Sequence, residues 1–308
     1  MPERRPPTLS VHERWRLAGP AWMVLAMLPW PIVETLPTLL SQPYSPFEIV
    51  WVRYGTHLLL MLTLWAPVDP TRLVRTTRPA LHAVRAAMML GMPAAFVLAL
   101  VRMPADTVMS IFWVEPLVAM LLGAVVLGER VGRRRWLSAT LAVGGVLMML
   151  GPPGAALGPA WIFPIAMAVC LALYQVLTRL MCEETTTARL FYTALGVWAP
   201  LSLGLPWFWK TPSLHDLAVM MSIGVLGYLV LVALDRAVDA APVSWLAPFA
   251  LAQPIWMVIL HATLGGVWPT PSAAAGVVVV LAAWLLFAWP GRAPGTADGP
   301  VTADRRTE

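Results

Sequence analysis

The feature that most constrains this chain is a succession of ten apolar segments separated by short polar turns. Each segment is close to the roughly 20 residues that an α-helix needs to cross a bilayer. Hydrophobic residues make up 59% of the chain and charged residues only 12%, about half the charged fraction of a soluble domain. Long apolar runs satisfy their backbone groups inside a membrane as helices. We therefore expect an all-α polytopic membrane protein with ten transmembrane helices.

The chain divides into two halves between polar ends. Residues 1–16 are rich in arginine and are expected to form a cytosolic tail, and residues 291–308 a disordered cytosolic tail. Five helices are expected in residues 17–151 and five in residues 160–289. The expected spans are Leu17–Leu40, Phe47–Val68, Pro79–Val101, Ala105–Gly128, Trp136–Leu150, Ala160–Met181, Arg189–Trp207, Leu214–Leu234, Pro242–Leu264 and Ser272–Trp289.

The basic residues set the expected orientation. Eighteen arginines fall in the segments on the side of the N-terminus, whereas the opposite side holds only Arg102 and Lys210. Cytoplasmic loops carry the excess of Lys and Arg in membrane proteins. Both termini are therefore expected in the cytoplasm, in a multi-pass protein of the plasma (inner) membrane. The net charge of +5 reflects this bias, and we expect no nucleic-acid partner.

The two halves share a pattern at a constant offset of 138 residues. The matched positions are Glu115-Pro116 with Gln253-Pro254, Gly128 with Gly266, and Ser138 with Gly276. An odd number of spans in each half places the halves in opposite orientations. The pattern therefore indicates two inverted five-helix repeats, a plan that puts the substrate site near the midplane between the halves.

Four motifs stand out in the apolar segments: WVRY at Trp51–Tyr54, LVRMPADTVMSIFWVEPLVAMLLGAVVLGER at Leu100–Arg130, LALYQVLTR at Leu171–Arg179, and LVALDRAVDAAPVSWLAPFALAQPIW at Leu231–Trp256. These motifs resemble those of EamA domains in the drug/metabolite transporter superfamily. The resemblance implies two EamA repeats. It also implies a secondary transporter of small organic metabolites, such as amino acids or related amines. The second half departs from the pattern, because Val267 stands where the first half has Glu129.

Glu115 is the leading candidate for a functional residue. At about 1.5 Å per helical residue it lies about 21 Å from Glu129, so it falls well inside the bilayer if Glu129 marks an interface. An intramembrane carboxylate is costly and is a functional candidate by default. Pro116 beside it predicts a helix kink. Glu115 could bind a substrate amine, take up a proton or pair with a buried arginine, and a static kink with an ion pair is the alternative.

Three further ionisable residues of the first half are candidates for substrate binding or proton coupling. Arg53 and His57 lie one turn apart on one helix face, and Arg53 is the expected partner of Glu115 or Glu34, since buried charges are usually paired. Alternatively, Arg53 extends to the interface and His57 is an ordinary buried polar residue. Glu34 lies among prolines in a broken helix, where freed backbone groups can bind ligands, or else it lies in water.

The second half supplies uncharged counterparts. Gln253, beside the expected kink at Pro254, replaces the carboxylate of Glu115 with an amide, which donates and accepts hydrogen bonds. Trp256 follows one turn later on the same helix. Tyr174 and Gln175 match positions that the resemblance places toward the interior. Each of these residues could line the cavity or could simply hold helices together.

Other polar and small residues are expected to be structural. Gly128 and Glu129 form the signature that ends the fourth span, and Glu129 is expected to fix the following loop through nearby arginines. Asp235, Arg236 and Asp239 are expected to form a similar charged loop. Gly144 and Gly145 allow close helix approach, either within the chain or in a homodimer.

The sequence favours a transporter over other classes. Lys210 does not lie in a Gly-rich loop, so the chain has no P-loop, and none of the five histidines forms a zinc-protease motif. We expect no enzymatic activity, no cofactor and no metal. The expected partners are a small-molecule substrate and the lipid bilayer, with alternating access around a midplane cavity and proton coupling as one option. A non-transporting scaffold or a channel is the alternative, followed by an intramembrane enzyme.

Overall fold

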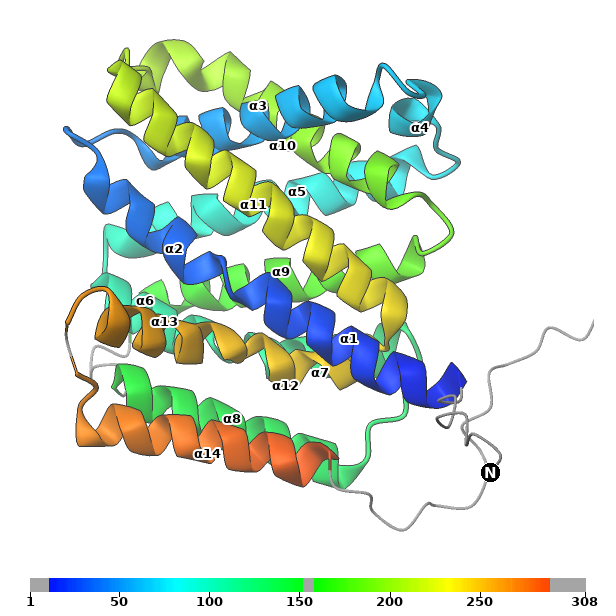
Figure 1. Cartoon of the computed structure of the whole chain (residues 1–308), viewed down its shortest axis with the longest axis vertical. Coiled ribbons are helices and arrows are strands. Elements are labelled where there is room, and N and C mark those ends of the chain that lie inside the picture. Colours follow the sequence, from blue (N-terminus) through cyan, green and yellow to red (C-terminus); the bar gives the residue numbers. More distant parts are fainter. Residues whose placement is uncertain (1–10, 152–157, 267, 289–308) are drawn as a thin grey trace, which may run out of the picture.

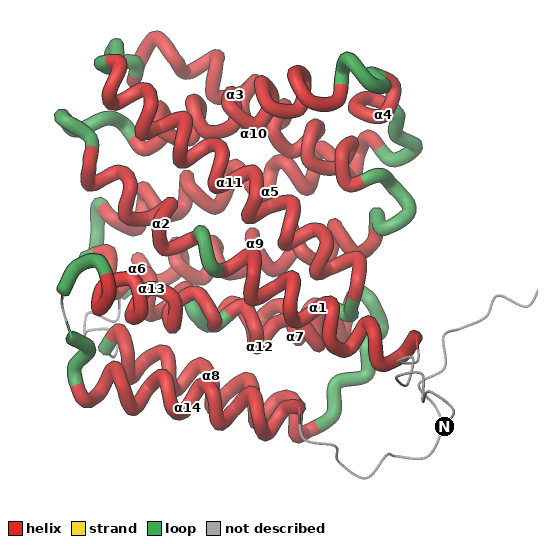
Figure 2. The backbone as a smooth tube through the Cα atoms, in the orientation of Figure 1, coloured by secondary structure: helices red, strands yellow, loops and turns green. Residues whose placement is uncertain are grey.

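The computed structural model describes residues 11–151, 158–266 and 268–288. Helices joined by short loops account for nearly all of this part of the chain, and it contains no strand (Figure 2). The all-α prediction is therefore confirmed. Both expected tails lie largely outside the described residues. The first helix begins at Val11, so residues 11–16, which the sequence assigned to the first tail, are helical.

The helices follow the predicted apolar segments closely. In chain order they are α1 (Val11–Met27), α2 (Trp30–Thr35), η1 (Leu36–Leu39), α3 (Pro46–Trp65), α4 (Thr71–Val74), α5 (Pro79–Leu100), α6 (Ala105–Phe112), α7 (Glu115–Val126), α8 (Arg133–Leu150), η2 (Pro159–Trp161), α9 (Ile162–Leu180), α10 (Thr186–Phe208), α11 (Leu214–Ala240), α12 (Val243–Ala250), α13 (Ala252–Thr263) and α14 (Pro271–Ala288).

Among the described residues, six helical stretches are long and apolar enough to cross a membrane. They are Ala18–Leu39, Pro79–Leu100, Ala105–Val126, Pro159–Leu180, Leu214–Ala240 and Val243–Thr263. A shorter apolar helix covers Pro271–Phe287. Large side chains on many of these helices are exposed, Val125 and Leu285 among them, as expected where lipid rather than water is the neighbour.

Three of the expected spans are broken rather than continuous. The first changes direction at Leu28-Pro29, between α1 and α2. The fourth is interrupted at Trp113-Val114 and the ninth at Leu251. Pro116 lies in the first turn of α7, where its missing N–H costs nothing. The sequence predicted a kink at Pro116 and at Pro254. The structure instead starts a new helix just before each proline.

Helix α11, which corresponds to the eighth expected span, is longer than predicted. The sequence placed its end at Leu234 and a charged loop after it, but α11 continues to Ala240. Ala241, which precedes Pro242, adopts an extended conformation with φ −151° and ψ 159°, as residues before proline prefer. The proline therefore sets the end of the helix, and Asp235, Arg236 and Asp239 lie on α11 rather than in a loop.

The helices pack mainly across the two halves of the chain. At one end of the molecule α8 lies beside α14, and at the other end α3 lies beside α10 (Figure 1). Between them α1 packs on α11, α5 packs on α9, and α7 packs on both α9 and α12. Gly145 lets α8 approach α14 closely, because a Cβ at this position would lie 2.8 Å from the carbonyl oxygen of Gly276.

Candidate functional site

Glu115 opens helix α7 in the interior of the molecule. The break after α6 places it at the start of a new helix, and its side chain is 1% exposed. Its Oε1 accepts a hydrogen bond of 2.8 Å from Nε2 of Gln175 on α9. Residue Glu115 and its partner come from opposite halves of the chain. The sequence placed both among its candidates but did not predict that they pair with each other.

A small cavity lies beside this pair. Glu115, Gln175 and Gln253 all line it, together with apolar side chains from both halves of the chain: Met27, Trp30, Phe112, Trp113, Leu171, Leu234 and Ala250. Its volume is about 10 Å³, enough for about one water molecule. Any metabolite is larger than this. The described side chains are therefore packed closely around Glu115 and leave no room for a larger molecule there.

A second carboxylate meets a second amide near the same place. Oε1 of Glu34 on α2 accepts hydrogen bonds of 2.8 Å from Nε1 of Trp30 and from Nε2 of Gln253. The prolines of the first span thus bring Glu34 against α13 rather than into a loop. Both carboxylates come from the first half and both amides from the second. Each carboxylate has a neutral hydrogen-bond donor across the interface between the halves.

Arg53 does not form the ion pair that the sequence predicted. Within the described residues it contacts neither Glu115 nor Glu34, whose oxygens are bound by amides instead. Its guanidinium lies against α11 at Gly227 and over the ring of Tyr54, 5.6 Å from the ring centre. The prediction of a direct pair was wrong because helix spacing gives the face on which a residue lies but not its partner.

The remaining candidates lie outside the cavity wall. His57 is buried between the rings of Tyr54 and Tyr228, at ring-centre distances of 4.8 and 5.8 Å. Trp256 is half-buried in an apolar groove next to α1 and donates to the carbonyl of Val24 over 3.4 Å. Tyr174 belongs to a separate polar network. Of the sequence candidates, Glu115, Gln175, Gln253 and Glu34 are the ones that the structure gathers together.

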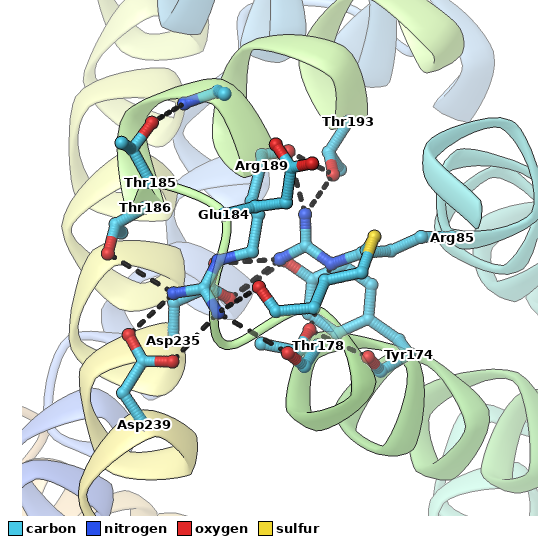
Figure 3. A network of polar contacts seen from close by, with 12 residues as sticks. Arg85, Tyr174, Thr178, Glu184, Thr185, Thr186, Arg189, Thr193, Asp235 and Asp239 are labelled. Atoms are coloured by element: carbon cyan, nitrogen blue, oxygen red, sulfur yellow. Dashed lines mark hydrogen bonds and ion pairs between the residues drawn. The ribbon is translucent and has the colours of Figure 1, made fainter. Parts of the chain in front are cut away.

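A buried network of charges is the main feature that sequence reasoning missed (Figure 3). Nη2 of Arg85 on α5 lies 2.7 and 2.8 Å from the two carboxylate oxygens of Asp235. Both side chains are fully buried. Arg189 on α10 pairs with Asp239 at 2.5 Å and lies 3.5 Å from Asp235. These contacts tie the ends of α5, α10 and α11 together.

Hydroxyl groups complete the network. Arg85 donates to Tyr174 over 2.5 Å, to Thr178 over 2.8 Å and to Thr193 over 2.6 Å, so its donors are well satisfied in the interior. The guanidinium also lies 4.1 Å from the centre of the Tyr174 ring. Arg85 lies near the start of the apolar span Pro79–Val101 but inside it, and that was the available signal: an arginine inside a span predicts a buried acidic partner.

Next to the network, a loop carboxylate is bound by threonines. Glu184 accepts hydrogen bonds of 2.9 Å from the backbone N–H and from the hydroxyl of Thr77, and one of 3.1 Å from Thr76. Burial alone would raise the pKa of Glu184, but these hydrogen bonds and the nearby His82 outweigh it and hold the pKa below its ordinary value. The carboxylate thus joins the α4–α5 loop to the loop before α10.

Glu129 binds the start of helix α12. Its two carboxylate oxygens accept hydrogen bonds of 2.9 and 2.8 Å from the backbone N–H groups of Val243 and Ser244. The first N–H groups of a helix have no partner within the helix. The helix dipole also stabilises a negative charge at this end. The structural role was predicted, but the partner was not: Glu129 connects the two halves rather than fixing its own loop through arginines.

The long apolar helices indicate a multi-pass integral membrane protein. Residues 17–151 match the EamA-like transporter family. An S-adenosylmethionine uptake transporter of Rickettsia prowazekii is 23% identical over 273 residues, which cover 88% of this chain and 92% of that protein. A riboflavin transporter of Rhizobium johnstonii is also 23% identical, over 85% of this chain and 89% of its own. These comparisons support a small-molecule transporter of the EamA drug/metabolite transporter type.

The fold is also that of a solved structure. One crystal structure superposes on 89% of this chain and on 98% of its own, with a TM-score of 0.76. The two sequences are 17% identical, so this likeness concerns the fold alone. The transporters named above extend over nearly the same length as this chain, so the comparison covers both halves of the molecule.

Proposed function

We propose that this protein is a secondary transporter that moves small organic metabolites with an amino group across the plasma membrane by alternating access. The observation that carries the proposal is a pair of carboxylates, the buried Glu115 and the exposed Glu34, each hydrogen-bonded to an amide of the other half. An ammonium group could replace either amide as the donor, because a charged hydrogen bond is roughly twice as strong as a neutral one. S-adenosylmethionine, the substrate named for several relatives, carries such a group.

We infer further that ten helices form two inverted repeats. Gly128 and Gly266, 138 residues apart, both have a positive φ, of 68° and 62°, a conformation that favours glycine. Ser138 donates to the carbonyl of Ala283, and Gly276 meets Gly145 in the corresponding position with the halves exchanged. The pairing of α1 with α11 likewise corresponds to that of α9 with α5. These correspondences support a twofold relation, and the distribution of arginines between the loops supports cytoplasmic termini.

In this arrangement the buried charged network lies toward the cytoplasm. Asp235 and Asp239 are near the C-terminal end of α11, and Arg85 and Arg189 are near the N-terminal ends of α5 and α10. Their ion pairs hold the inner ends of these helices together. Opening toward the cytoplasm would require those ends to separate, and the substrate could then leave the cavity beside Glu115.

The test is transport by the purified protein in liposomes, with S-adenosylmethionine, amino acids, amines and riboflavin as candidate substrates and an imposed pH gradient. We expect saturable uptake of an amino-bearing compound. Glu115→Gln should reduce this uptake at least tenfold and remove its dependence on pH. Glu183→Gln, which changes a carboxylate that is 80% exposed, is the matched control and should behave like the wild type.

Two results would contradict the proposal. If correctly folded wild-type protein moves no compound of the panel, the chain is a scaffold rather than a transporter. If Glu115→Gln transports at the wild-type rate at every pH, Glu115 has no part in the mechanism and the site lies elsewhere.

A further inference from the structure

A polar cavity of about 390 Å³ lies between loops that come from the two halves of the chain. One wall belongs to residues 69–78, around α4, and the other to residues 183–185, before α10. Three arginines, four threonines and three carboxylates line the cavity, and the described lining includes no apolar residue. This volume lies within the range of small-ligand sites, whereas the cavity beside Glu115 has only about 10 Å³.

Two of the three carboxylates of this cavity are bound by threonines. Oε1 of Glu184 accepts hydrogen bonds from the hydroxyl of Thr76 and from both the N–H and the hydroxyl of Thr77. Oδ1 of Asp69 accepts two from Thr71, at 3.1 Å from the N–H and 2.6 Å from the hydroxyl. A ligand that donates hydrogen bonds would therefore compete with donors of the protein itself.

The arginines of the cavity, in contrast, retain unused donors. Arg75 is exposed, and its guanidinium has no hydrogen bond or ion pair with the residues that the structure describes. Within the same residues Arg72 uses only Nε, which lies 3.1 Å from Asp69. Arg78 is engaged, with Nη2 3.1 Å from Glu183. A guanidinium carries five N–H donors, so a ligand rich in acceptors would find most of its partners on Arg75 and Arg72.

The cavity lies at the end of a membrane segment. Arg78 immediately precedes α5, and Pro79–Leu100 is one of the stretches that can span a bilayer. The polar headgroup region of the bilayer begins where such an apolar segment ends. Arginines at this level attract anionic headgroups and water-soluble anions.

We propose that this cavity binds a phosphate group, which Arg75 and the unused Nη groups of Arg72 hold through charge-assisted hydrogen bonds. An arginine can bind two oxygens of one phosphate through parallel bonds. Glu184 and its threonines keep the two loops together around the ligand. The phosphate belongs either to a phospholipid headgroup or to a water-soluble phosphate compound. The site is separate from the cavity beside Glu115, so it would exist whether or not the protein transports amines.

Other ligand chemistries fit these residues less well. Within the described part of the chain, no group of three histidine, cysteine, aspartate or glutamate residues could hold a metal ion. An organic cation would meet three arginines, and an apolar ligand would meet a lining without apolar side chains. A carboxylate offers two acceptor oxygens, whereas a phosphate monoester offers three and can engage both arginines.

The experiment tests both sources of phosphate with the full chain purified in detergent. Native mass spectrometry measures the binding of phosphatidylglycerol and of a galactolipid that has the same acyl chains but no phosphate. Thermal unfolding in sodium phosphate, compared with sodium chloride of equal ionic strength, measures the binding of inorganic phosphate. We expect the wild type to bind phosphatidylglycerol at least fivefold more tightly than the galactolipid, to be stabilised by inorganic phosphate, or both.

Arginine variants separate a specific site from a general attraction of anions. Arg75→Gln removes donors that have no partner among the described residues. It should therefore keep the unfolding temperature measured without ligand and lower the affinity for the bound probe at least fivefold. Arg75→Lys keeps the charge but loses the planar fork of donors, so it should lower the affinity by less. Arg133→Gln removes another exposed arginine, outside this cavity, and should bind like the wild type.

The two measurements also identify the ligand. A preference for phosphatidylglycerol alone would indicate a phospholipid headgroup, and stabilisation by inorganic phosphate would indicate a water-soluble phosphate compound. Either result upholds the site. The absence of both effects in the wild type, or an equal loss of affinity in Arg75→Gln and Arg133→Gln, would overturn the proposal.

Discussion

Glu129 illustrates how a single side chain can hold the two halves of the molecule in register. Its carboxylate accepts hydrogen bonds from the first two N–H groups of α12, although four arginines follow it within six residues of sequence. The backbone groups have no other partner at a helix start, whereas the arginine side chains can reach water. Glu129 therefore gives these backbone N–H groups an acceptor, whereas the loop arginines can donate to water instead.

Replacing Glu129 should lower the free energy of unfolding by the contribution of one helix cap. Glu129→Ala leaves the N–H groups of Val243 and Ser244 without an acceptor, and we expect a loss of about 0.5–2 kcal/mol in the free energy of unfolding. Glu129→Gln, which keeps one acceptor oxygen, should lose less. The unfolding temperature in detergent measures both, with the exposed Glu183→Ala as control. Equal stability of Glu129→Ala and the control would show that the cap does not matter.

Glu184 predicts how stability depends on pH. Its pKa in the folded protein lies below the ordinary value of 4.5, so the folded state binds fewer protons at this group than the unfolded state. Its contribution is therefore present above about pH 4.5 and is lost as the pH falls through the depressed pKa. Below pH 4.5 the unfolding temperature of the wild type should fall more steeply than that of Glu184→Gln. Parallel curves would contradict this assignment.

At the scale of helices, the ion pair between Arg85 and Asp235 joins α5 to α11, although the two residues are 150 positions apart in the sequence. Asp235→Asn leaves two buried guanidinium groups without their shared counter-ion. Removing one partner of a buried pair costs about 3–5 kcal/mol, so the unfolding temperature should fall markedly. Asp239→Asn should cost less, because Asp239 is 30% exposed. The double variant Arg85→Met/Asp235→Leu should recover part of the loss, since it leaves no unpaired charge at that pair.

The helices themselves were largely predictable, and their partners were not. Apolar length identified the spans, and proline beside Glu115 and Gln253 marked the places where two of them break. The sequence pattern could not show that Asp235 continues a helix, because a charged run after an apolar segment also fits a loop. Nor could it pair Glu115 with Gln175, since periodicity assigns a residue to a helix face and leaves its neighbour across the interface undefined.

At the scale of the whole molecule, α8 and α14 form a close pair at the end of the bundle away from α3 and α10 (Figure 1). The described side chains that line the small cavity come from neither of these two helices. Their contact depends on glycine, because a Cβ at Gly145 would also lie 2.9 Å from Cγ2 of Val280. The sequence left open whether Gly144 and Gly145 serve packing within the chain or a dimer, and Gly145 serves the former.

Neighbouring glycines provide a matched test of this packing. Gly145→Ala should destabilise the protein by about 1–3 kcal/mol through crowding against α14. A methyl group added at Gly144 would have no neighbouring atom within 4 Å. Gly144→Ala should therefore stabilise the protein by up to about 1 kcal/mol, the difference in helix propensity between alanine and glycine. Unfolding temperatures of the two variants measure the contrast. Similar shifts for both would mean that α8 and α14 separate easily.

The division of acids and amides has a consequence for the ancestry of such a chain. Glu34 and Glu115 lie in the first half, and Gln175 and Gln253 in the second. A protein assembled from two copies of the first half would bring four carboxylates to its centre with no amide to donate to them. One made from two second halves would have amides alone. Whatever the two halves once had in common, they now complement each other chemically, and neither could be replaced by a copy of the other.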